Sequence, residues 1–138
     1  MPEEAIEKIV ESSRRNLRDA ICQLECFKYS KDPDKIMHPY KPEIKEIVGM
    51  IYKEQSPNQI LNVRSKLYDL LVNCVEGSTI LKELILLMIE SKRFSEENMY
   101  YLIHKATEFE TTMAQGTKPI VHLECFVAHA METVWKQK

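Results

Sequence analysis

The chain has 138 residues, which is enough for one domain or for a small domain with a fragment of another. Its 19 basic and 21 acidic residues give a formal net charge of -2, so the overall charge does not favour nucleic acid as the main partner. No apolar run approaches the roughly 20 residues of a membrane span, and the chain starts with the acidic MPEEAIEKIV rather than a signal peptide. These features predict a soluble intracellular protein without a membrane partner.

Two short helices are predicted at the start of the chain. Ala5, Ile6, Ile9 and Val10 recur at helical spacing, and Asn16 is a favourable N-cap for a second helix. Two helices of this length are too short to be stable alone in water. We therefore expect them to depend on a further part of a protein for their stability.

The second helix opens with a basic cluster in the stretch SSRRNLRDAICQLEC, made by Arg14, Arg15 and Arg18. A helix N-terminus already carries a partial positive charge, so arginine there is unfavourable unless an anion compensates it. A phosphate group is the obvious candidate. A solvated basic turn is the alternative interpretation.

The glycine content limits how such a phosphate could be held. Gly49, Gly77 and Gly116 are the only glycines, so neither a P-loop nor a dinucleotide-binding fingerprint can be written in this chain. We therefore expect no catalytic residue in the chain and no ATPase activity of its own. Any phosphate would be held mainly by groups outside it.

Two sets of cysteine and histidine residues raise the question of a metal site. Cys22 and Cys26 are one helical turn apart, and His122, Cys125 and His129 share one face of the last predicted helix. Two ligands do not make a zinc site, and histidines seven residues apart lie on the order of 10 Å apart along a helix, too far for zinc bonds of about 2 Å. No third group is placed to orient a Cys/His nucleophile. We predict no metal, reduced cysteines, and burial of the first cysteine pair against another domain.

A linker is predicted at residues 29–41, because three prolines interrupt the helical pattern in the stretch YSKDPDKIMHPYKP. Five amphipathic segments follow within residues 42–138, without an alternating strand pattern or a hairpin signal. The predicted fold class is therefore all-α. A five-helix domain is preceded by two short helices within residues 1–28.

The second helix of the domain has the strongest start signal. Ser56 is an N-cap, Pro57 occupies the first helical position, and Gln59 is placed to complete a capping box. The third helix, at about residues 78–91, is apolar almost all round, which predicts a central helix. The fourth helix is expected to stop at Gly116.

Five residues of this domain are predicted to contact a partner. Arg64 lies within an apolar arc, and a buried arginine must find hydrogen-bond acceptors, so it should link helices or cross a subunit boundary. An arginine that extends into solvent is the alternative. Tyr100 and Tyr101 lie off the main stripe of the fourth helix, and Phe126 and Trp135 lie at the edges of the fifth. Aromatic residues exposed in this way are typical of partner surfaces.

Three separated blocks, SRRNLRDA, SPNQILNVRSKLYDLLVNC and QGTKPIVHLECFVAHAM, together resemble one family. They are similar, in the same order, to the C-terminal part of a small subunit of replication factor C, the clamp loader, closest to the subunit 3 type. The resemblance runs from about residue 12 to the end of the chain. It implies that residues 1–28 are the last helices of an AAA+ lid and that residues 42–138 are the collar domain that holds five subunits in a ring.

The resemblance also implies a function and a role for one arginine. The chain would be the assembly module of a nuclear machine that loads the sliding clamp PCNA onto primed DNA, with other replication factor C subunits as its partners. ATP and Mg would be cofactors of the full-length subunit, with none in this chain. Arg18 would be the lid arginine that senses the γ-phosphate, whereas Arg14 and Arg15 have no assigned role. The family often has Gly-Asp where this chain has Arg15 and Asn16.

A second class of function competes with the clamp-loader assignment. The chain could be a free-standing helical adaptor or a metal-binding domain. The linker bounded by prolines and the Cys/His faces are the features that support this alternative.

Overall fold

The computed structural model describes residues 3–13, 15–30 and 40–137, which form seven helices and no strand. The prediction of an all-α fold is therefore confirmed. The chain divides into two compact units, Met1–Lys41 and Pro42–Lys138. Of the predicted linker, residues 31–39 lie outside the described part of the chain, whereas residues 29 and 30 belong to a helix.

The first unit consists of α1 (Glu3–Ser12) and α2 (Leu17–Ser30), which pack against each other. Ala5 and Ile9 are buried between them, whereas the other two members of the predicted stripe, Ile6 and Val10, are exposed. The hydroxyl of Ser12 donates a hydrogen bond to the side-chain oxygen of the buried Gln23, which ties the two helices together. Little apolar surface is buried within this unit.

The start of α2 has the predicted cap. The N–H of Asp19 donates to Asn16 Oδ1 at 3.4 Å, so Asn16 occupies the N-cap position. Arg15, immediately before it, has a φ of 67°, which is unfavourable for a residue with a Cβ atom and reverses the chain between the two helices. Leu17, Ile21 and Leu24 of α2 are exposed along one side of the helix.

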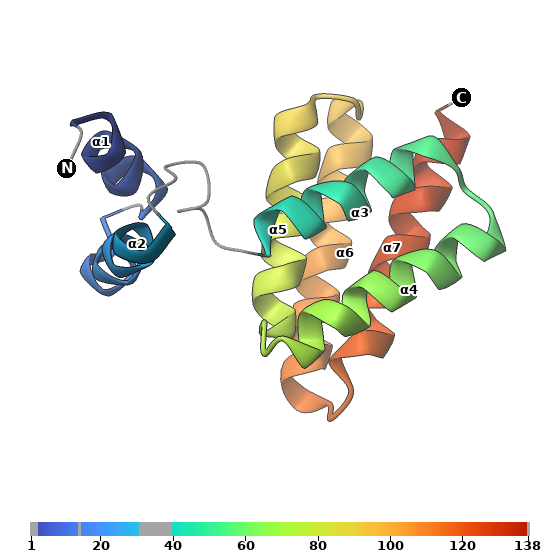
Figure 1. The fold of residues 1–138 in the computed structure, drawn as a ribbon. Helices are drawn as coiled ribbons and strands as arrows, with labels where there is room; N and C mark the ends of the chain where they lie inside the picture. The colour runs from blue at the N-terminus through green and yellow to red at the C-terminus, as the bar shows by residue number, and fades with distance from the viewer. Residues whose placement is uncertain (1–2, 14, 31–39, 138) are drawn as a thin grey trace. The chain divides into compact units, whose positions relative to one another are not determined.

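The second unit contains α3 (Lys41–Lys53), α4 (Pro57–Val72), α5 (Gly77–Ser91), α6 (Glu96–Gln115) and α7 (Pro119–Lys136). Figure 1 shows these helices gathered into one bundle, in which α5 and α6 lie side by side. Gly116 lies directly after α6, as the sequence predicts. No helix within the described residues combines the length and apolar character that crossing a membrane requires.

The start of α4 has only half of the predicted capping box. The side chain of Ser56 accepts a hydrogen bond from the N–H of Gln59 at 3.2 Å, which is the expected cap. The amide of Gln59 does not return to Ser56. It donates instead to the backbone oxygen of Met50 at 3.4 Å and accepts from Asn62 at 3.1 Å. Gln59 is buried, so its amide is used to join the end of α3 to α4.

The core of the second unit is centred on α7. This helix packs against α6, α4 and α5, and its inner face is buried along its length. The prediction that α5 is the central helix is wrong, because α5 packs mainly on α6 and α7 and leaves Ile89 exposed. The largest side chains with no exposed surface come from all five helices: Ile44, Ile47, Ile51, Leu67, Ile80, Leu84, Met88, Leu102, Leu123 and Phe126.

A small aromatic cluster joins the end of α3 to the loop after α5. The hydroxyl groups of Tyr52 and Ser91 are 2.8 Å apart, and Ser91 already donates to the backbone oxygen of Met88, so Tyr52 is the donor in this pair. The guanidinium of Arg93 lies 4.8 Å from the centre of the Tyr52 ring, and the ring of Phe94 lies 5.6 Å away. Partial burial raises the pKa of Tyr52. The cluster therefore holds the short loop between α5 and α6 against α3.

Candidate interaction surfaces

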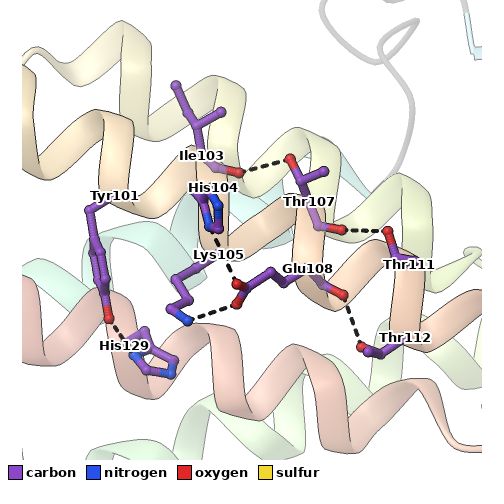
Figure 2. A network of polar contacts seen from close by, with 9 residues as sticks. All are labelled: Tyr101, Ile103, His104, Lys105, Thr107, Glu108, Thr111, Thr112 and His129. Carbon is purple, nitrogen blue, oxygen red and sulfur yellow. Dashed lines mark hydrogen bonds and ion pairs between the residues drawn. The ribbon is translucent and has the colours of Figure 1, made fainter.

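Polar side chains connect α6 to α7 on one side of the bundle. The hydroxyl of Tyr101 and Nδ1 of His129 share a hydrogen bond of 3.0 Å, and the ring of Phe109 lies 5.7 Å from the His129 ring. Further along, Thr112 Oγ1 and His122 Nδ1 are 3.2 Å apart. Figure 2 shows Tyr101 reaching across to His129 from the neighbouring helix. We call these five residues the α6–α7 polar seam.

Charged residues of α6 continue this network. Lys105 Nζ lies 2.7 Å from a carboxylate oxygen of Glu108, and His104 Nδ1 lies 3.4 Å from the other one (Figure 2). The hydrogen bond from Lys105 lowers the pKa of Glu108, because it favours the charged carboxylate. Thr107 and Thr111 turn their hydroxyl groups back to the helix backbone. These polar groups are thus satisfied mostly by each other within the chain.

An ion pair joins α4 to α7 on another side of α7. The guanidinium of Arg64 binds both carboxylate oxygens of Glu124, with Nη2 at 2.7 Å from Oε2. The Arg64 side chain is 47% exposed and that of Glu124 17%. The hydrogen bond to Glu124 raises the pKa of Arg64. Arg64 therefore links two helices of this chain, which is one of the two roles the sequence predicts, but it is exposed rather than buried.

A hollow of about 280 Å³ lies at one end of the α4–α7 contact. Its walls come from the start of α4 and the end of α7, and include Pro57, Ile60, Ala128, Met131 and Trp135. A hollow of this size suits a side chain rather than a drug-sized ligand. Trp135, at 68% exposed, is the large aromatic residue at its rim.

The structure separates the four aromatic residues that the sequence assigns to a partner surface. Phe126 has no exposed surface, so its assignment to an exposed surface is wrong: it points from α7 into the core. Tyr100 is 71% exposed and Tyr101 is 40% exposed, but Tyr101 is already bound to His129. Trp135 remains available at the surface.

The basic cluster at α2 lies in the other unit. Arg18 is exposed in the first turn of α2, and Arg15 is exposed just before it. Arg14 lies outside the described residues. An exposed arginine at this place is free to meet a phosphate held elsewhere, and the role of Arg18 stays a prediction.

The cysteine and histidine residues do not gather around a common centre. Cys22, Cys26 and Cys125 are exposed thiols, and within the described residues no three potential ligands come together as a metal site would need. His122 and His129 each bond a residue of α6 instead. The first two cysteines are exposed in this chain, so their burial against another domain stays a prediction, as does the absence of a metal.

Sequence reasoning missed the residues that connect the helices. Glu124 is the partner of Arg64, yet the two are 60 positions apart in the sequence, and no local pattern could join them. His129 appeared only as a possible metal ligand. Sequence reasoning also missed the exposed apolar side of α4. A usable signal for it was the helical recurrence of Leu61, Tyr68 and Val72, which lie away from the buried residues of this helix.

The fold and the surface of the second unit together define its structural class. The second unit is a five-helix bundle whose described surface features are a polar seam between helices, an internal ion pair and an exposed apolar side. The second unit is therefore an all-α helical-bundle domain.

The comparisons with known proteins give the family. Residues 40–138 match the family model described as replication factor C subunit 3, C-terminal domain. The chain is 36% identical over 135 residues to replication factor C subunit 5 of Oryza sativa subsp. japonica, covering 94% of this chain and 37% of the relative. It is 35% identical over 136 residues to replication factor C subunit 3 of Arabidopsis thaliana, covering 95% and 38%. The human replication factor C subunit 3 is 27% identical over 136 residues, with the same coverage of 95% and 38%.

The chain belongs to the replication factor C family, as the resemblance of its three sequence blocks predicts. It spans less than two fifths of the length of the relatives named above. The matched domain coincides with the part of the chain that forms the five-helix bundle.

Proposed function

We propose that this chain is the C-terminal assembly module of a clamp-loader subunit. In this proposal residues 42–138 form the collar domain, which holds the subunit in a heteropentamer with other replication factor C subunits. The observation that supports it best is the match of residues 40–138 to the subunit 3 C-terminal domain, over a bundle whose free surface is suited to protein contact. The family match favours this function over a free-standing adaptor or a metal-binding domain.

The proposed function extends to the activity of the whole clamp-loader complex. The assembled complex uses ATP and Mg bound by an ATPase core to load PCNA onto primed DNA in the nucleus. The chain described here contributes no ATPase activity and binds no cofactor of its own. Residues 1–28 are the end of the AAA+ lid, residues 29–41 are the linker, and the exposed side of α2 with Leu17, Ile21 and Leu24 is covered by that core.

This function is tested by measuring whether the chain assembles with other subunits. Mixed with the other replication factor C subunits of the same organism, the chain should appear in one complex with them by native mass spectrometry. The same subunits without the chain are the control, because they should lack that species. A chain that stays free while the other subunits associate would rule out the assembly role.

The role of Arg18 is tested in a protein that can bind nucleotide. We expect Arg18→Ala, in a chimera joining this chain to the N-terminal part of a subunit 3 or subunit 5 relative, to weaken ATP binding about tenfold and ADP binding much less. The reason is that only ATP offers the γ-phosphate charge. Calorimetric titration with both nucleotides measures the difference.

Arg15→Ala is the matched control, since Arg15 is an exposed arginine of the same cluster without an assigned role. It should leave both affinities nearly unchanged. Equal losses of ATP and ADP binding in the Arg18 variant would return Arg18 to the solvated-turn interpretation.

A further inference from the structure

Exposed large hydrophobic side chains of the second unit lie mainly on α4 and α7 and, within one turn, on α6. Those of α4 and α7 are Leu61, Tyr68, Val72, Val121 and Trp135. We call these five residues, with the hollow beside Trp135, the α4–α7 face. Exposed apolar side chains gathered on neighbouring helices are typical of a binding site for another protein.

The helical spacing explains why these residues share one side. On α4, Leu61, Tyr68 and Val72 are seven and four residues apart, so they lie on one stripe of the helix. On α7, Val121 and Trp135 are separated by fourteen residues, close to four full turns. The core-facing residues of both helices, such as those at positions 63, 67, 123 and 127, point elsewhere and are buried. The two stripes of side chains therefore remain exposed after the five helices have packed into their core.

The charged groups beside the α4–α7 face are paired within the chain. Arg64 binds Glu124 between the two helices, and Lys136 lies 2.6 Å from Glu132 at the end of α7. Because these charges neutralise each other, the face offers apolar contact rather than a positive field. The α6–α7 side differs, since its surface is occupied by the polar seam and by the Lys105–Glu108 pair. The two sides of α7 are thus chemically distinct.

The hollow offers a binding position for one large side chain of a partner protein. It is open at the end of the α4–α7 contact and has Ile60, Met131 and Trp135 in its walls. In protein interfaces, one buried apolar or aromatic side chain in such a recess contributes much of the binding free energy. A groove between two packed helices also accepts the apolar side of a third helix.

We propose that the α4–α7 face binds a helix of a neighbouring replication factor C subunit, with one large apolar side chain of that helix in the hollow beside Trp135. This inference rests on the proposed function, and it names the surface through which the assembly occurs. The occupant is another subunit because each relative of this chain is named as a subunit of replication factor C and because the paired charges disfavour nucleic acid. It places the assembly surface on α4 and α7, whereas four of the five contact residues predicted from the sequence lie on α6 and α7.

The experiment compares two matched pairs of substitutions. The test variant is Leu61→Lys with Trp135→Glu on the α4–α7 face, and the control variant is Ile103→Lys with Tyr100→Glu on α6, where the replaced side chains are also exposed. Each chain is co-purified with the other subunits of its complex, and its affinity for them is measured. We expect at least about a tenfold loss for the test variant and a much smaller change for the control. Circular dichroism of each chain alone should show unchanged helix content.

A second readout uses a natural thiol on α7. Cys125 is exposed next to the α4–α7 face, one turn from Val121, so bound subunits should slow its alkylation in the unmodified chain. The alkylation rate of Cys22, which is exposed in the other unit, is the control for a general change in thiol accessibility. Protection of Cys125 supports the proposal even if a substituted chain folds poorly.

The outcomes separate this inference from the proposed function. If the unmodified chain binds no subunit, the proposed function fails and this inference fails with it. If the unmodified chain binds but only the α6 variant loses affinity, or neither does, the α4–α7 face is not the interface and the function stands. If the test variant instead abolishes only pairing of the chain with a second copy of itself, the inference is also overturned.

Discussion

Phe126→Ala is expected to destabilise the second unit by about 3–5 kcal/mol, the range for truncation of a buried aromatic residue. The side chain has no exposed surface and is the largest of the fully buried ones, so its removal loses apolar contact and leaves a cavity. A domain is typically stable by only about 5–15 kcal/mol, so the variant should be close to unfolding at physiological temperature. Urea denaturation followed by circular dichroism measures the loss.

Trp135→Ala provides the matched control for this result. Both residues are aromatic and lie on α7, but Trp135 is 68% exposed, so the free energy of unfolding should change by no more than about 0.5 kcal/mol. A small effect of Phe126→Ala together with a loss of subunit binding would restore the assignment of Phe126 to the partner surface. Similar losses of stability for both variants would contradict the packing of α7.

Gly77→Val is expected to destabilise the second unit by about 3 kcal/mol, near the upper end of the usual range for overpacking. A Cβ atom at this first position of α5 would lie 2.8 Å from Sδ of Met113 and 2.9 Å from Cβ of Pro119. The methionine side chain can move, but the proline ring at the start of α7 is rigid. The glycine is therefore needed for the close approach of α5 to the ends of α6 and α7. Thermal unfolding of the chain measures the effect.

Gly49→Ala is the control, because a Cβ atom there meets nothing within 4 Å. Gly49 lies inside α3, where alanine is favoured over glycine, so this substitution should stabilise the unit by about 0.5–1 kcal/mol. Opposite signs for the two glycine variants are the expected pattern. Destabilisation by both would mean that loss of a glycine, rather than contact with Pro119, causes the effect.

The sequence by itself determined the local structure, because local structure depends on neighbours along the chain. Helical spacing predicted the all-α class, and Asn16, Ser56 and Gly116 mark helix ends where the structure has them. The three resembling sequence blocks also identified the family, since they preserve residue order over most of the chain.

Other assignments required the tertiary structure, because they depend on contacts between segments distant in the sequence. Helical spacing could not tell whether Phe126 lies at an edge or in the core, since this depends on how α7 packs against three other helices. Nor could it predict that Glu124 pairs with Arg64, or that Gln59 donates to Met50 instead of completing its capping box. Packing alone decided that α7 rather than α5 is central, and it left an apolar face on α4 and α7 beside a polar seam on α6 and α7. The physical reason is that a helix has several apolar directions, and only the positions of its neighbours determine which of them is buried.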